Sequence, residues 1–149
     1  MSDTFSLTLT RQQGFQFLVS FSPELPGLLV DEPPPLGKGE GPTPNQLLAA
    51  AAANCLSASL LFALSKFKQD AGEVRAEARC EIGRNEQNRL RVSGITVHLT
   101  LGRPAADIQH LDRILGQFED FCTVTQSIRH GIPVAVTVSD TTGSVLKQS

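Results

Sequence analysis

The sequence predicts an α+β fold in which antiparallel strands surround one long helix. Residues 47–64 form an uncharged run of eighteen residues rich in alanine and leucine, which indicates the helix. Segments of alternating apolar and polar residues come before and after this run, and two further helical patterns precede a last strand. Because the strands form hairpins that are separate from the helices, the order indicates an α+β class. The length of 149 residues suits a single domain, 1–149.

The N-terminal part predicts a hairpin followed by a long loop. Residues 5–10 and 15–21 alternate between apolar and polar side chains, with the polar turn 11–14 between them. Residues 28–30 suggest a short third strand. The segment 31–44 is a loop rich in proline and glycine, and its length suggests a functional or partner-contacting role.

The central helix has a clear start signal. Thr43 is a suitable N-cap, Pro44 suits the first helical position, and Gln46 can complete a capping box. Apolar residues occur on all sides of this helix, so we expect other elements to enclose it completely. A transmembrane span is the alternative, but polar residues such as Asn54 and Ser57 in its middle favour a buried helix in a protein that contacts no membrane.

The C-terminal part begins with a second predicted hairpin. Apolar residues at alternate positions of 74–82 predict an inward face that includes Cys80. The return strand, 90–101, changes apolar parity at Ser93 and Gly94, which indicates a β-bulge.

The last third predicts two helices and a strand. Residues 108–121 have amphipathic helical spacing, and a capping box from Thr123 to Gln126 predicts a short helix that ends near His130. Residues 134–138 predict a strand with alternate valines inward, and we expect 141–149 to be a frayed tail.

Composition excludes several classes of function. The net charge is −2, and five arginines between positions 75 and 91 alternate with glutamates, which is typical of a solvated face and not of a nucleic-acid site. Trp and Tyr are absent, so stacking platforms for single-stranded nucleic acid are not expected. The first residues lack the basic and apolar regions of a secretion signal, so we expect a cytoplasmic location.

Three cysteines are the candidates for chemistry. Their odd number and wide spacing predict neither a disulfide framework nor a zinc site, and in a reducing compartment their thiols stay free. Cys122 directly precedes a predicted helix, where backbone amides can lower the pKa of a thiol; a small core residue is the alternative. Cys55 lies mid-helix among alanines that leave its thiol little covered, whereas Cys80 is expected to be a core residue. The three histidines lack the spacing of a metal site.

Two segments carry a resemblance to a known family. The helix entry GPTPNQLLAAAAANCL and the later segment FCTVTQSI place two cysteines 67 residues apart. With the order of elements, these segments resemble the OsmC/Ohr family of osmotically inducible and organic hydroperoxide resistance proteins, over nearly the whole chain. The resemblance implies an intertwined homodimer, with antiparallel sheets wrapped around two long central helices.

The resemblance also implies an activity of the peroxiredoxin type in the response to oxidative stress. Cys55 would attack an organic hydroperoxide as a thiolate and become a sulfenic acid, Cys122 would resolve it as a disulfide, and a dithiol reductant would reopen the disulfide. No metal or organic cofactor is implied. Arg11 would hold the thiolate, and Asn45 stands where the family has a glutamate that positions this arginine.

The chain departs from the family pattern at Asn45 and at Thr123, where many relatives have proline. These departures place it among divergent OsmC-like members. A non-enzymatic protein that binds an apolar small molecule or senses redox state is therefore the alternative function. An unrelated α+β domain with structural cysteines is a third interpretation.

Overall fold

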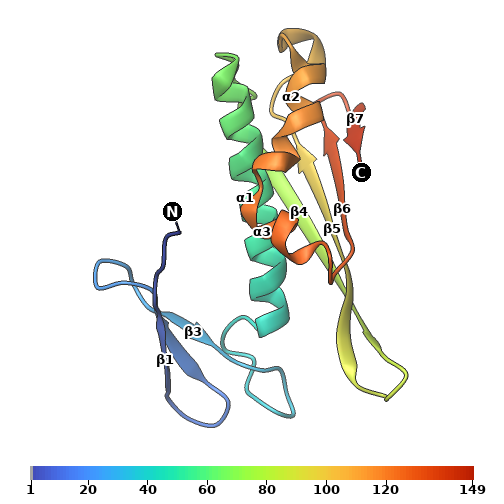
Figure 1. Ribbon diagram of the computed structural model, residues 1–149. Coiled ribbons are helices and arrows are strands. Elements are labelled where there is room, and N and C mark those ends of the chain that lie inside the picture. Colours follow the sequence, from blue (N-terminus) through green and yellow to red (C-terminus); the bar gives the residue numbers. More distant parts are fainter. Residues whose placement is uncertain (1) are drawn as a thin grey trace. The chain divides into compact units, whose positions relative to one another are not determined.

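The computed structural model describes residues 2–149, whose contacts divide them into two units between Leu47 and Leu48. The first unit contains a three-stranded antiparallel sheet in the order β1-β2-β3 (Figure 1). Its strands are β1 (Thr8–Arg11), β2 (Phe17–Ser20) and β3 (Leu28–Val30). The predicted hairpin and third strand are confirmed.

A buried carboxylate orders the predicted loop. Asp31 is 2% exposed and accepts hydrogen bonds from the amides of Glu32, Lys38 and Glu40 at 2.8, 3.2 and 3.1 Å. The side chain of Gln16 donates a fourth bond at 3.2 Å. Burial alone would raise the pKa of Asp31, but these bonds together lower it below its usual value.

The long helix begins as predicted. Helix α1 (Pro44–Lys66) opens with a capping box in which the Gln46 amide donates to Thr43 Oγ1 at 3.2 Å. In return, the Thr43 amide donates to Gln46 Oε1 at 2.9 Å. Both bonds satisfy amides that the first turn leaves free, so the local sequence fixes this end of the helix.

The second unit contains a four-stranded sheet in the order β4-β5-β6-β7. Its strands are β4 (Arg75–Arg84), β5 (Leu90–Thr100), β6 (Val134–Ser139) and β7 (Val145–Gln148). Strands β5 and β6 run parallel, so this sheet is mixed and not wholly antiparallel as predicted. A parallel pair requires a crossover connection, which the segment between the two strands supplies.

The predicted bulge in the return strand is confirmed, whereas the prediction of a frayed tail at 141–149 is wrong. Glu81 pairs with Gly94 and Ile82 pairs with Val92, which leaves Ser93 as an extra residue on β5. The predicted tail contains β7, which pairs with β6 because its backbone completes the edge of the sheet.

The predicted helix 108–121 is broken. It is replaced by a 3₁₀ turn η1 (Ala105–Asp107), α2 (Leu111–Gln117) and a 3₁₀ turn η2 (Phe118–Phe121). His110, with φ 61°, takes the left-handed conformation before α2, so a continuous helix cannot pass through it. Short helix α3 (Thr123–Ile128) follows, capped by Cys122 and not by Thr123 as predicted.

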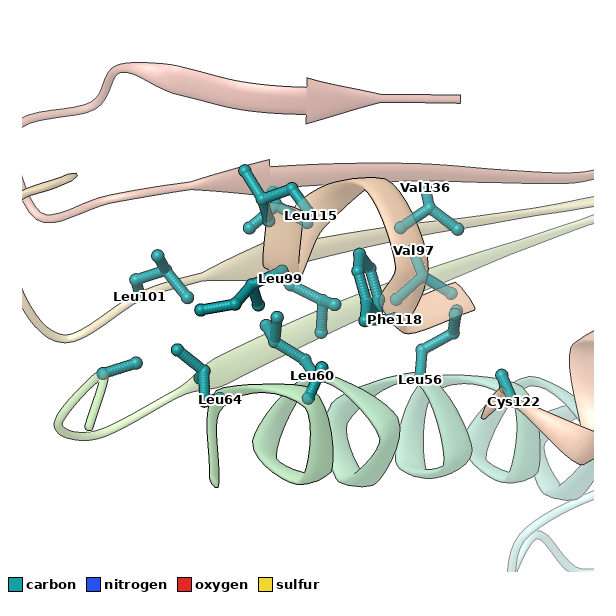
Figure 2. Packing of buried hydrophobic residues seen from close by; sticks show 14 of the residues in the cluster. Leu56, Leu60, Leu64, Val97, Leu99, Leu101, Leu115, Phe118, Cys122 and Val136 are labelled. Atoms are coloured by element: carbon teal, nitrogen blue, oxygen red, sulfur yellow. The ribbon is translucent and has the colours of Figure 1, made fainter. Parts of the chain in front are cut away.

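The core of the second unit lies between α1, the sheet and α2 (Figure 2). Leu56, Leu60 and Leu64, one turn apart on α1, are at most 1% exposed, and Phe118 is fully buried against the same cluster. Among the described residues, α1 is long and apolar enough to span a membrane by length and composition. A core helix passes the same test, and this face of α1 is packed in a core.

Two predictions of burial, for all sides of α1 and for the inward face of β4, are wrong within this chain. Leu61 and Phe62 on α1 are 49% and 50% exposed, so other elements do not enclose the helix on every side. On β4, Ala76 and Ala78 are exposed and Ile82 is 48% exposed, although the alternation predicts them on an inward face. Leu61 and Phe62 on α1 and Ile82 on β4 are therefore apolar side chains that stay about half exposed.

Candidate functional site

Cys55 lies on the face of α1 that borders the core. It is half-buried and packs against the core cluster beside Leu56. Helical spacing places Cys55, Ala58, Ser59 and Phe62 on one side of the helix, since residues three and four positions apart are neighbours. This part of the helix therefore presents a thiol among small side chains and one aromatic ring.

An open depression of about 380 Å³ lies over this thiol. It is lined by Cys55, Ala58, Ser59, Phe62 and Phe121. The two phenylalanine rings meet edge to face with their centroids 5.2 Å apart. The depression is mainly apolar, so it suits a small organic molecule better than a highly charged one.

The ammonium group of Lys66 lies over the aromatic pair. Lys66 Nζ is 4.6 Å from the ring centroid of Phe121 and 5.2 Å from that of Phe62. At these distances the ammonium group is attracted to both ring faces. These two phenylalanines were not predicted from the sequence as site residues. The helical spacing of Phe62 from Cys55 and the adjacency of Phe121 to Cys122 were signals for them.

Cys122 is held in the core at the start of α3. It is fully buried, and its amide donates to the Glu119 carbonyl at 3.0 Å. Its own carbonyl accepts from the Gln126 amide at 3.0 Å, the first bond of the helix. Figure 2 shows Cys122 beside the turn of α1 that carries Leu56. Backbone bonds on both sides thus fix the thiol next to α1.

The structure brings Cys55 and Cys122 together. Burial raises the pKa of the Cys122 thiol, and the adjacent Cys55 side chain raises it further, while the hydroxyl and amide of Thr125 act in the opposite direction. The expected lowering by the helix start is wrong, because desolvation of the fully buried sulfur outweighs the contribution of a six-residue helix. A sulfur 67 residues away along the chain is therefore the neighbour of the thiol in the depression.

The other two predicted site residues belong to the first unit. Arg11 is exposed and is the last residue of β1, where its Nε donates to the Gly14 carbonyl at 2.9 Å. Asn45 is the second residue of α1 and is half-buried. The cysteine pair lies wholly within the second unit, so the roles of Arg11 and Asn45 beside Cys55 stay predictions.

Cys80 and the histidines form no further site. Cys80 is half-buried on β4 and packs against the core cluster, as expected. Within residues 2–149, no group of three His, Cys, Asp or Glu side chains is arranged to hold a metal ion. His98 Nε2 lies 2.7 Å from Ser139 Oγ.

Glu119 is a buried carboxylate that sequence reasoning missed. Its side chain is 10% exposed and pairs with Arg129 at 2.9 Å and Lys147 at 3.1 Å. Ser149 Oγ donates to both carboxylate oxygens, at 2.9 and 3.1 Å. Burial would raise the pKa of Glu119, but these three partners lower it below its usual value. The carboxylate thus ties the turn before Cys122 to α3 and β7.

Comparisons with known proteins identify the family of the chain. A family model described as OsmC-like protein matches residues 37–137, which is more than half of the chain. The chain belongs to the OsmC-like protein family. The match covers all three cysteines of this OsmC-like protein and the whole of α1.

Solved structures share the fold at low identity. An OsmC-like protein of unknown function from Vibrio cholerae is 15% identical with a TM-score of 0.76, covering 92% of this chain and 99% of its own. An organic hydroperoxide resistance protein from Elizabethkingia anophelis is 22% identical with a TM-score of 0.72, covering 94% and 99%. The organic hydroperoxide resistance protein OhrB of Bacillus subtilis is 17% identical with a TM-score of 0.67, covering 90% and 98%. A search of curated protein sequences finds no match.

Proposed function

We propose that this OsmC-like protein is a thiol-dependent peroxidase that reduces organic hydroperoxides with Cys55 and Cys122. The observation that carries the proposal is the contact of two thiols at an apolar depression into which one of them opens. Cys55 lines the depression and is the accessible nucleophile, whereas Cys122 is fully buried behind it. The organic hydroperoxide resistance proteins among the structural relatives add support by fold.

The reaction has three balanced steps. The Cys55 thiolate attacks the outer oxygen of the hydroperoxide, the O–O bond breaks and a sulfenic acid forms. The departing alkoxide takes up the proton that the thiol had released and leaves as an alcohol. Cys122 then attacks the Cys55 sulfur, so that an S–S bond forms, the S–O bond breaks and water leaves. A dithiol reductant reopens the disulfide and restores both thiols, and is itself oxidised to a disulfide. Sulfur supplies all of the redox chemistry, so the mechanism uses no metal or organic cofactor.

Arg11 and Asn45 complete the proposed site. Arg11 stabilises the Cys55 thiolate, as the family resemblance implies. Asn45 hydrogen-bonds this arginine in place of the family glutamate. A neutral amide holds a guanidinium less firmly than a carboxylate does, so the enzyme is slower than relatives with the glutamate.

The proposed enzyme is a homodimer of one domain, 1–149. We place it in the cytoplasm, whose reducing conditions fit a reaction that needs reduced thiols.

Substitution of Cys55 tests the proposal. The Cys55→Ser variant loses hydroperoxide consumption in the presence of a dithiol, because the hydroxyl cannot form a sulfenic acid. Cys80→Ser is the matched control and keeps the parent rate, since Cys80 lies on β4 outside the depression. An unchanged rate in Cys55→Ser contradicts the mechanism.

A second candidate is a non-enzymatic protein that binds a small apolar molecule or senses redox state. Asn45 favours it, because a weakly held arginine would leave Cys55 less activated. The same assay separates the two. A sensor forms its disulfide once and turns over no further hydroperoxide when dithiol is supplied, whereas an enzyme consumes hydroperoxide until the dithiol is spent.

A further inference from the structure

Thr125 is a fully buried residue whose hydroxyl lacks a hydrogen-bond partner among the described residues. Its exposure is 0%, and Oγ1 makes no bond that meets ordinary geometry. A buried hydroxyl without a partner costs free energy, so most buried hydroxyls in folded proteins are paired. A valine of the same shape would avoid this cost, so we expect the hydroxyl of Thr125 to have a role of its own.

Its place in α3 directs this hydroxyl toward Cys122. Cys122 caps the helix with φ −84° and ψ 94°, and Thr125 is the third helical residue after it. In a capping box, the side chain of the cap faces the amide of the third residue, and the side chain of the third residue reaches back. Here the side chain at the cap is a thiol that makes no capping hydrogen bond, so a sulfur without that bond stands where an oxygen is usual.

The influence of Thr125 on the thiol agrees with this geometry. Burial raises the pKa of Cys122 and Cys55 raises it further, and both the Thr125 hydroxyl and the Thr125 amide oppose them. A donor that acts in this direction favours the charged form of the sulfur. The resolving step needs that form, because a thiolate and not a thiol is the nucleophile.

We propose that Thr125 is a catalytic residue of the resolving step, whose hydroxyl donates a hydrogen bond to the Cys122 sulfur as that sulfur attacks the Cys55 sulfenic acid. In this step the Cys122 proton passes to the departing hydroxide, which leaves as water. The S–S bond forms as the S–O bond breaks, so Cys122 is oxidised and Cys55 is reduced. The oxidant is the hydroperoxide of the preceding step, and in this respect the inference rests on the proposed function.

The test compares variants of Thr125 in single-turnover experiments. Thr125→Val keeps the shape and removes the hydroxyl, and Thr125→Ser restores a hydroxyl. We expect Thr125→Val to slow disulfide formation by about ten- to a hundredfold, the effect of one hydrogen bond to a charged group. Oxidation of Cys55 by the hydroperoxide keeps its rate, and Thr125→Ser recovers most of the loss.

The pH profile separates chemistry from packing. In Thr125→Val the pH dependence of disulfide formation moves upward, because the thiolate has lost a donor. Thr123→Val is the matched control: it makes the same chemical change at an exposed position two residues away, and it leaves rate and profile unchanged. Disulfide formation by Thr125→Val at the parent rate with the parent profile would overturn the inference.

A second readout does not depend on peroxidase activity. In a background with Cys55→Ser and Cys80→Ser, Cys122 is the remaining thiol, and ultraviolet absorbance of its thiolate reports its titration. If the hydroxyl donates a hydrogen bond to the sulfur, adding Thr125→Val moves this titration to higher pH. An unmoved titration overturns the inference even where the parent is an active peroxidase. A parent protein that never forms the disulfide, together with a moved titration, overturns the proposed function alone.

Discussion

The two sulfurs of the site differ in their contact with solvent. Cys55 borders the open depression, while Cys122 is fully buried and its pKa is raised by that burial. A hydroperoxide can reach the first sulfur without rearrangement of the core. Cys122 reacts only after Cys55 has been oxidised, so the difference in exposure sets the order of the steps. Burial also protects Cys122 from oxidation by other routes.

Glu119 gives a testable dependence of stability on pH. Because its pKa is lowered in the folded protein, its stabilising contribution is present above the usual value of 4.5 and is lost as pH falls through the folded value. We expect Glu119→Gln to lower the free energy of unfolding at pH 7 by about 2 kcal/mol, since Arg129 and Lys147 lose a charged partner. Chemical denaturation at several pH values measures the difference.

The control for this prediction is Glu86→Gln, which makes the same change at an exposed carboxylate in the β4–β5 turn. It should alter stability by less than about 0.5 kcal/mol. The gap between the parent and Glu119→Gln should narrow as pH falls below 4.5. A gap that stays constant down to strongly acidic pH would show that the charge of Glu119 does not stabilise the fold.

Some residues of the site were predicted from the sequence, and others were not. The prediction of Cys55 and Cys122 as partners came from the family resemblance, because nothing in a separation of 67 residues indicates contact. Glu119 and Thr125 were not foreseen as site residues, since their burial depends on elements that pack only in the folded chain. Phe62 could have been found, because it lies seven positions after Cys55 on a helix that was correctly predicted.

At the scale of elements, local signals were reliable and long-range ones were not. The start of α1 was predicted because Thr43 and Gln46 bond within one turn. The bulge at Ser93 was predicted because it shifts the parity of one strand. The sequence did not predict the parallel pairing of β5 with β6, nor the strand β7. The pairing of strands that are distant in sequence produces no pattern within either strand.

The exposed side of α1 shows a further limit of sequence patterns. Apolar residues on every side of a helix indicate that all of its faces avoid water, but they do not show whether the same chain covers those faces. Leu56 and Leu60 are covered by the second unit, whereas Leu61 and Phe62 are about half exposed. The same holds for Ile82 on β4, which the alternation predicts to point inward and which is 48% exposed.

At the scale of the whole molecule, these exposed apolar residues support the proposed homodimer. Contiguous apolar surface is rarely left open in a soluble protein and usually marks an interface. We expect sedimentation to give a dimer at micromolar concentration, with Leu61→Asp shifting it toward monomer. Gln109→Asp, at an exposed position outside α1 and β4, is the control and should leave the dimer intact. A parent protein that sediments as a monomer would contradict this expectation.

The central claim is that two thiols in contact form one redox pair, and the most direct test is to map disulfides after oxidation. The reduced protein is treated with one equivalent of organic hydroperoxide without dithiol, then digested and analysed by mass spectrometry. We predict one disulfide, between Cys55 and Cys122, with Cys80 still free. Three free thiols with the hydroperoxide unconsumed, or a disulfide that involves Cys80, would contradict the account.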